Sequence, residues 1–132
     1  MSGGGAVARD AGPFALRLEE ALLSIDRTGI EATLDAAATD GGMTPHEVAD
    51  EVIAPALERI GDGWEAGTVA LSQVYMSGRL LEAAIARGAE PALPMSGTPV
   101  IGVAVLEDHH ALGKRILVSV LRSAGCDVRD LE

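Results

Sequence analysis

Apolar residues recur at helical spacing in the first third of the chain. One set lies between Pro13 and a break at residues 26–29, and a second set follows the break. The two sets are Phe14, Leu18, Ala21, Leu22 and Ile25, and then Ile30, Leu34, Ala37 and Ala38. Because this spacing places the apolar side chains on one face, it predicts two amphipathic helices. The glycines at positions 41 and 42 are expected to end the second helix.

A capping box predicts where a third helix begins. Thr44 is the cap residue, Pro45 occupies the first helical position, and Glu47 lies three residues after the cap. The apolar stripe of this helix consists of Val48, Val52, Ile53, Ala56, Leu57 and Ile60. Pro55 has no backbone N–H to donate, so the helix is expected to kink or break near Ala54.

Two glycines and one more apolar stripe complete the helical part of the chain. Gly61 and Gly63 are expected to loosen the chain after the third helix. A fourth helix is predicted over about residues 72–87, with Gly88 at its end. Four successive helices over residues 13–88 predict a small four-helix bundle. Residues 1–12 are rich in Gly and Ala without periodicity, and they predict a disordered tail.

The pattern changes after a connector at residues 89–97, whose prolines and glycine predict a domain boundary. Residues 100–105 form a continuous apolar run, which is typical of a strand covered on both faces of a parallel sheet. A helix with Leu117, Val120, Leu121 and Ala124 on one side follows, and residues 126–131 predict a second strand. Residues 98–132 therefore predict the β-α-β start of a Rossmann-like (flavodoxin-like) domain, and the fold class is α followed by α/β.

Such a β-α-β unit is incomplete as a sheet. Two strands with one helix are too few to cover their own faces. We therefore expect either a truncated form of a longer protein or a sheet that another copy or another chain completes. A homo-oligomer through the exposed sheet edge is one consequence.

Charge and composition narrow the class of partner. The chain has 20 acidic and 10 basic residues, and the resulting charge of −10 repels nucleic acid and anionic lipid surfaces. The apolar run at 99–106 is far shorter than the roughly 20 residues of a membrane-spanning helix. The first residues do not resemble a secretory signal, and a single cysteine, Cys126, cannot form an internal disulfide. These features favour a soluble, cytoplasmic protein without nucleic-acid or membrane partners.

The candidate chemistry lies directly after the first strand. Asp108, His110 and Gly113 follow its carboxyl end, where open α/β sheets hold their ligands. The carboxylate of Asp108 can accept the Nδ1 proton of His110, which directs Nε2 outward as a more basic metal ligand. Gly113 leaves space for a ligand or its phosphate at the first helical turn. The structural alternative is a polar loop with a capping aspartate and solvated histidines.

Taken together, these motifs resemble those of the corrinoid (cobalamin)-binding proteins related to methionine synthase. The resemblance rests on Asp108, His110 and Gly113 between a strand and a helix, and on the glycine-flanked Trp64 at residues 60–67. It implies a four-helix cap over a Rossmann-like domain. It also implies that His110 replaces dimethylbenzimidazole as the lower ligand of cobalt, that Asp108 tunes this ligand and that Gly113 makes room for the nucleotide tail. Trp64 would lie near the upper face of the corrin, although an ordinary core position is the alternative.

The resemblance implies a methyl carrier rather than a complete enzyme. The chain would hold methylcobalamin or a related corrinoid with His110 on cobalt, and would carry a methyl group between methyltransferase modules. A stand-alone adenosylcobalamin-binding sensor or regulator is an alternative, although Val74 and Tyr75 stand where light-sensing regulators have a Glu-His pair. Residues 108–110 also form the triplet of metal-dependent DHH phosphoesterases, and a helical interaction module is the remaining alternative.

Overall fold

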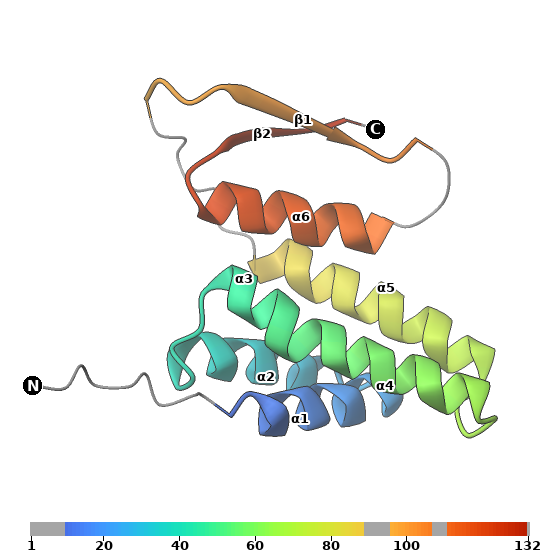
Figure 1. Cartoon of the computed structure of the whole chain (residues 1–132). Coiled ribbons are helices and arrows are strands. Elements are labelled where there is room, and N and C mark those ends of the chain that lie inside the picture. Colours follow the sequence, from blue (N-terminus) through green and yellow to red (C-terminus); the bar gives the residue numbers. More distant parts are fainter. Residues whose placement is uncertain (1–9, 89–95, 107–110, 132) are drawn as a thin grey trace, which may run out of the picture.

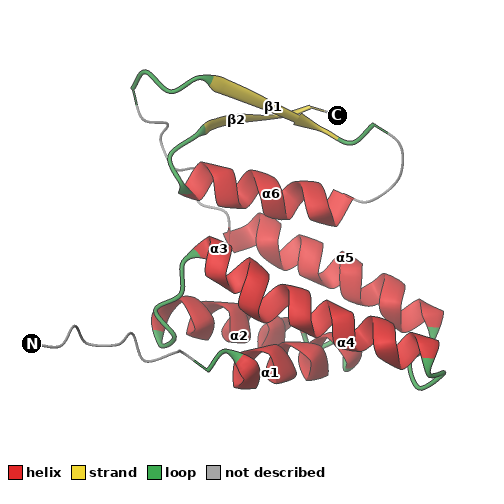
Figure 2. Cartoon of the chain, in the orientation of Figure 1, coloured by secondary structure: helices red, strands yellow, loops and turns green. Residues whose placement is uncertain are grey.

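The computed structural model describes residues 10–88, 96–106 and 111–131. Two layers are stacked in it (Figure 1). The lower layer contains helices only, and the upper layer contains one helix beneath a small sheet (Figure 2). The disordered tail predicted at the N-terminus lies largely outside the described residues. The first helix begins at Gly12, one residue before the predicted boundary, and Ala11 is buried.

The helical layer is built from three separate helices and one longer helical run. The separate helices are α1 (Gly12–Leu23), α2 (Arg27–Thr39) and α5 (Leu71–Gly88). The longer run joins α3 (Pro45–Val48), a π-helical segment η1 (Ala49–Ile53) and α4 (Ala54–Glu65). The core of the helical layer contains the fully buried side chains of Leu18, Leu22, Ile30, Val52, Ile60 and Leu81. Most of these residues belong to the apolar stripes that the sequence indicates.

The predicted capping box is confirmed. The Thr44 amide donates to Glu47 Oε2 over 2.7 Å, and the Glu47 amide donates to Thr44 Oγ1 over 3.2 Å. Helix α3 begins at Pro45, where the missing N–H costs no hydrogen bond. The pair of reciprocal bonds satisfies two amides that a bare helix end would leave unpaired.

The structure shows no break at Pro55 and none at the glycines that follow. The helical run continues past the proline because η1, which ends two residues before it, widens the helix where a regular one would clash with the proline ring. Gly61 and Gly63 both lie inside α4. Gly63 is needed for close packing, since a Cβ atom there would lie 2.6 Å from Cγ2 of the buried Val69.

The upper layer is a parallel β-α-β unit. Strands β1 (Val100–Ala104) and β2 (Asp127–Leu131) pair in parallel, and α6 (Ala111–Ser123) connects them. Helix α6 covers one face of the sheet, and Val128 is buried there. On the other face, alternate residues of β1 from Val100 onward are exposed. The prediction of cover on both faces is therefore wrong for the described residues, in which only α6 packs on the sheet.

The two layers meet at α6 and α5. Leu112 and Ile116 of α6 pack against the apolar core of the helical layer, and α3 also contacts α6. Most of the predicted connector, residues 89–95, lies outside the described residues. Among the described helices, none is both long enough and apolar enough to cross a membrane.

Candidate functional site

The ends of five elements lie on one side of the molecule. The carboxyl ends of β1 and β2 and the N-terminal end of α6 lie on the right-hand side of Figure 1. The C-terminal end of α4 and the N-terminal end of α5 lie on the same side, in the lower layer. Ligands of open α/β sheets bind at the carboxyl ends of the strands, and the free amides of a helix N-terminus attract anionic groups. This end is therefore the candidate site.

Gly113 lies in the first turn of α6 and is exposed. A Cβ atom built on Gly113 would meet no other atom of the described chain within 4 Å. Packing within the described chain therefore gives no reason for a glycine here, in contrast to Gly63. No described residue fills the space over this turn, which is compatible with the predicted role of Gly113 in leaving room for a bulky group.

Asp108 and His110 lie outside the described residues, and so does His109. The structure therefore does not show whether Asp108 orients His110, and the axial-ligand assignment stays a prediction. The structure does fix both flanks of this loop. Strand β1 ends at Ala104 and α6 begins at Ala111.

Trp64 lies in the last turn of α4 and is 51 % exposed. The chain folds back directly after it, because the Gly67 amide donates to the Trp64 carbonyl over 3.0 Å and the Thr68 amide donates to the Gly63 carbonyl over 2.8 Å. Gly67 adopts a φ of +76°, as this helix ending requires. Because the Trp64 side chain is half exposed, the alternative of an ordinary core position for this residue is wrong.

Other apolar side chains near the start of α5 are also exposed. Leu71 and Tyr75 are mostly exposed, and Met76 is about one-third exposed. With Trp64, they give this end of the helical layer large apolar side chains that the described chain does not cover. Such side chains suit contact with an apolar macrocycle or another apolar surface.

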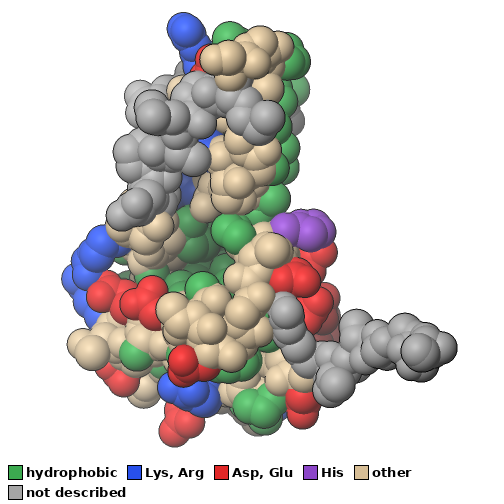
Figure 3. Space-filling model, turned by 90° about the vertical axis from the view of Figure 1, so that its left-hand side faces the viewer, with side chains coloured by type: hydrophobic (Ala, Val, Ile, Leu, Met, Phe, Trp, Pro, Cys, Tyr) green, Lys and Arg blue, Asp and Glu red, His purple; other side chains and the backbone are tan. Residues whose placement is uncertain are grey.

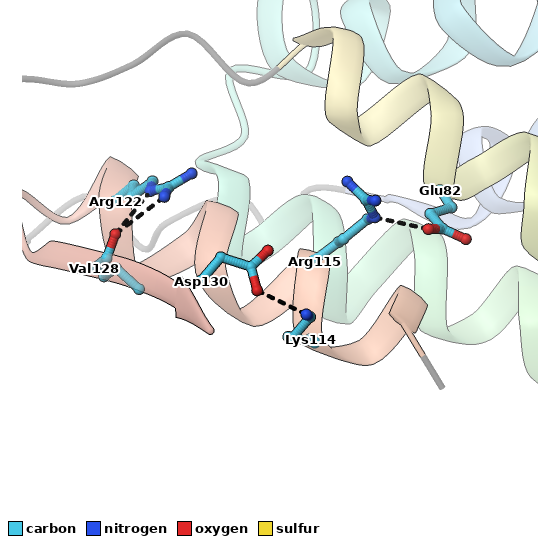
Figure 4. Close-up of polar contacts among 6 residues, drawn as sticks. All are labelled: Glu82, Lys114, Arg115, Arg122, Val128 and Asp130. Carbon is cyan, nitrogen blue, oxygen red and sulfur yellow. Dashed lines mark hydrogen bonds and ion pairs between the residues drawn. The ribbon is translucent and has the colours of Figure 1, made fainter. Parts of the chain in front are cut away.

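Three basic residues of α6 connect the helix to its surroundings (Figure 4). Lys114 forms an ion pair with Asp130 of β2 over 2.7 Å. Arg115 points the other way and donates to Glu82 of α5 over 2.7 Å. At the far end of α6, the Arg122 guanidinium donates to the Val128 carbonyl oxygen, with Nη2 3.0 Å away. The sequence analysis did not identify these contacts. The lysine directly after Gly113 marks a charged residue at the site, but its partner on β2 is 16 positions away in the chain.

A cavity of about 440 Å³ lies elsewhere in the molecule. Its lining comes from α2, α3, η1, α5 and α6, and includes Leu34, Val48, Ile53, Ala84, Ile85 and Ile116. Figure 3 shows a hollow with an apolar floor between the layers on the left-hand side of Figure 1. Neither Gly113 nor Trp64 lines this cavity, which reaches the end of α5 at Gly88. Within the described residues, no group of three or more His, Cys, Asp or Glu side chains could hold a metal ion.

Comparison with known proteins identifies the family of the chain. The family model described as "B12 binding domain" matches residues 15–87, which is more than half of the chain and covers most of the helical layer. The chain is 32 % identical over 107 residues to monomethylamine corrinoid protein 1 of Methanosarcina acetivorans, a match that covers 76 % of this chain and 49 % of that protein. It is 30 % identical over 122 residues to monomethylamine corrinoid protein 1 of Methanosarcina mazei, with 87 % of this chain and 55 % of that protein covered.

The chain spans about half the length of these curated relatives. The matches extend well beyond the helical layer, because they cover three quarters or more of this chain. They agree with the resemblance carried by Asp108, His110, Gly113 and Trp64. The chain therefore belongs to the B12 binding domain family, and its cofactor is a corrinoid of the cobalamin class.

Proposed function

We propose that this chain is the corrinoid-holding part of a methyl carrier. In this proposal the helical layer at residues 12–88 is a four-helix cap, and β1, α6 and β2 begin a Rossmann-like domain beneath the corrinoid. The proposal is carried by one observation. The open first turn of α6 at Gly113 lies at the same end of the molecule as the exposed Trp64 region of the cap.

Each site residue has a distinct role in this proposal. His110 would bind cobalt through Nε2, and Asp108 would accept the Nδ1 proton and so hold the imidazole in one orientation. Gly113 would leave room for the nucleotide tail, whose phosphate would lie near the free amides of α6. When bound, the corrinoid supplies the cobalt centre that accepts and donates the methyl group.

The exposed apolar residues of the cap would shield the upper side of the site. Trp64, Leu71 and Tyr75 would exclude water from the reactive face. Methyltransferase modules, which we propose as the partners, would need the cap to move away from α6. We place this movement in the connector at residues 89–97.

The names of the relatives favour the carrier over the other candidates. Both curated relatives are monomethylamine corrinoid proteins, which supports neither a phosphoesterase nor a light-sensing regulator. Cytoplasmic localisation stays a prediction. Self-association through the sheet, whose outer face is exposed in the described residues, also stays a prediction.

The assignment of His110 can be tested with the visible spectrum. The full chain is mixed with hydroxocobalamin, and the same experiment is repeated with His110→Ala and with His109→Ala as the matched control. We expect wild type and His109→Ala to show a cobalt–imidazole spectrum from the protein, and His110→Ala to lose it. If His109→Ala loses the spectrum and His110→Ala keeps it, the proposed ligand is wrong. If all three chains leave the spectrum of hydroxocobalamin unchanged, the proposed corrinoid-holding role of this chain is wrong.

A further inference from the structure

Lys114 and Asp130 form an ion pair at the candidate site. Lys114 Nζ lies 2.7 Å from Asp130 Oδ1, and the lysine side chain is only 14 % exposed although lysine is usually solvated. Lys114 is in the first turn of α6, directly after Gly113, and Asp130 is one residue before the end of β2. The pair therefore joins the start of the helix to the carboxyl end of the sheet (Figure 4).

The position of this pair differs from that of the other contacts of α6. Arg122 connects α6 to β2 at the opposite end of the helix, through the Val128 carbonyl. Arg115 connects α6 to α5, because its side chain donates to Glu82. Of these three residues, only Lys114 holds the ligand-facing end of α6 to the strands.

The register of the sheet shows what the pair restrains. Asp130 pairs with Val103, the next-to-last residue of β1, so it lies near the carboxyl end of that strand. Strand β1 ends at Ala104, and α6 begins at Ala111, three residues before Lys114. A partly buried ion pair is screened less by salt than an exposed one, and it restricts the lysine stem as well as the charge.

We propose that Lys114 is a positioning residue for the corrinoid site. Its ion pair with Asp130 fixes the first turn of α6, and Gly113 with it, against the carboxyl ends of β1 and β2. Without the pair, this turn moves relative to the strands and the groups that the site presents to the corrinoid lose their alignment. This inference rests on the proposed function.

The first test uses the chain without cofactor. Amide hydrogen exchange is measured in wild type, in Lys114→Met and in Arg122→Met, which removes the contact at the other end of α6. We expect Lys114→Met to raise exchange at least threefold at residues 115–118, and Arg122→Met to raise it instead toward the end of α6. Equal exchange at residues 115–118 in wild type and Lys114→Met would overturn the proposal.

The second test measures the fraction of bound hydroxocobalamin that shows the cobalt–imidazole spectrum. We expect this fraction to fall at least threefold in Lys114→Met and to stay at the wild-type level in Arg122→Met. If wild type shows no such spectrum, the proposed function fails. If wild type shows it and Lys114→Met shows the same fraction, only the positioning proposal fails.

A charge swap keeps the test decisive if Lys114→Met does not fold. The double variant Lys114→Asp, Asp130→Lys restores an ion pair with its charges exchanged. We expect it to restore both the low exchange at residues 115–118 and the imidazole-bound fraction. Recovery of folding without recovery of the imidazole-bound fraction would reduce the pair to a structural contact and overturn the proposal.

Discussion

Arg115 Nε donates to Glu82 Oε1 over 2.7 Å, and this bond connects the upper layer to the helical layer (Figure 4). Glu82 is largely buried, and it also lies 3.5 Å from Arg79 on its own helix. The contact between α5 and α6 is otherwise apolar where Leu112 and Ile116 meet the core. The bond therefore adds orientation to an interface that apolar packing alone would hold less specifically.

The Glu82–Arg115 pair should contribute modestly to stability. In a double-mutant cycle with Glu82→Gln and Arg115→Gln, we expect a coupling free energy of about 0.5–1 kcal/mol, because Arg115 is partly exposed and screened by solvent. Urea unfolding measures the cycle. Glu82→Gln with Arg79→Gln is the comparison, and we expect weaker coupling there over 3.5 Å. Coupling of zero for Glu82–Arg115 would mean that the layers are held by packing alone.

Two glycines of α4 should respond in opposite directions to the same substitution. Gly63→Ala places a Cβ atom 2.6 Å from Val69 Cγ2, so we expect a loss of roughly 1–3 kcal/mol in the free energy of unfolding. Gly61→Ala meets no atom of the described chain within 4 Å and should gain up to about 1 kcal/mol from helix propensity. Chemical denaturation compares the two variants. Equal effects would show that the close approach to Val69 is not what requires glycine at position 63.

Ile25 occupies a backbone conformation that favours glycine. Its φ is +58°, and it follows α1 at the point where the Asp26 amide donates to the Ala21 carbonyl over 2.9 Å. Ile25→Gly and Ile25→Ala both remove the half-exposed apolar side chain, but only glycine removes the Cβ clash. We expect the glycine variant to be more stable by about 1 kcal/mol in thermal or urea unfolding. An alanine variant of equal or greater stability would contradict the strained φ.

Ser77 is fully buried in α5, and its hydroxyl has no hydrogen-bond partner among the residues that the structure describes. Ser77→Ala should therefore raise the free energy of unfolding by roughly 1 kcal/mol, because it removes an unpaired buried polar group. Thr33 provides the contrast, since its hydroxyl donates to the Gly29 carbonyl over 2.7 Å. Thr33→Val should lower stability by about 0.5–1.5 kcal/mol. A loss of stability in Ser77→Ala similar to that in Thr33→Val would point to a partner for the serine.

Local signals in the sequence predicted the helical layer well. Periodicity indicated the buried faces, and Thr44 with Glu47 indicated where α3 begins, because these depend on residues close together in the chain. The continuous helix through Pro55 was not predictable in the same way. The π-helical segment that accommodates the proline and the contact of Gly63 with Val69 both depend on packing.

The candidate site could be predicted only in part. The strand and helix that flank the motif were predictable, because strand ends and helix starts follow from local pattern. The assignment of Asp108 and His110 to the site stays a prediction. The ion pairs of Lys114 and Arg115 join residues that are 16 and 33 positions away from them, at Asp130 and Glu82. No local pattern specifies such partners. The exposure of Trp64 likewise depends on how the chain folds back after α4.

In the proposed function, the corrinoid lies between the Trp64 end of the helical layer and the first turn of α6. The chain has a single tryptophan, so its fluorescence reports on that position alone. We expect hydroxocobalamin to quench Trp64 emission in a saturable titration, beyond the absorption loss measured with a free tryptophan derivative. The midpoint should match that of binding measured by equilibrium dialysis. Binding by dialysis without quenching of Trp64 would contradict the account.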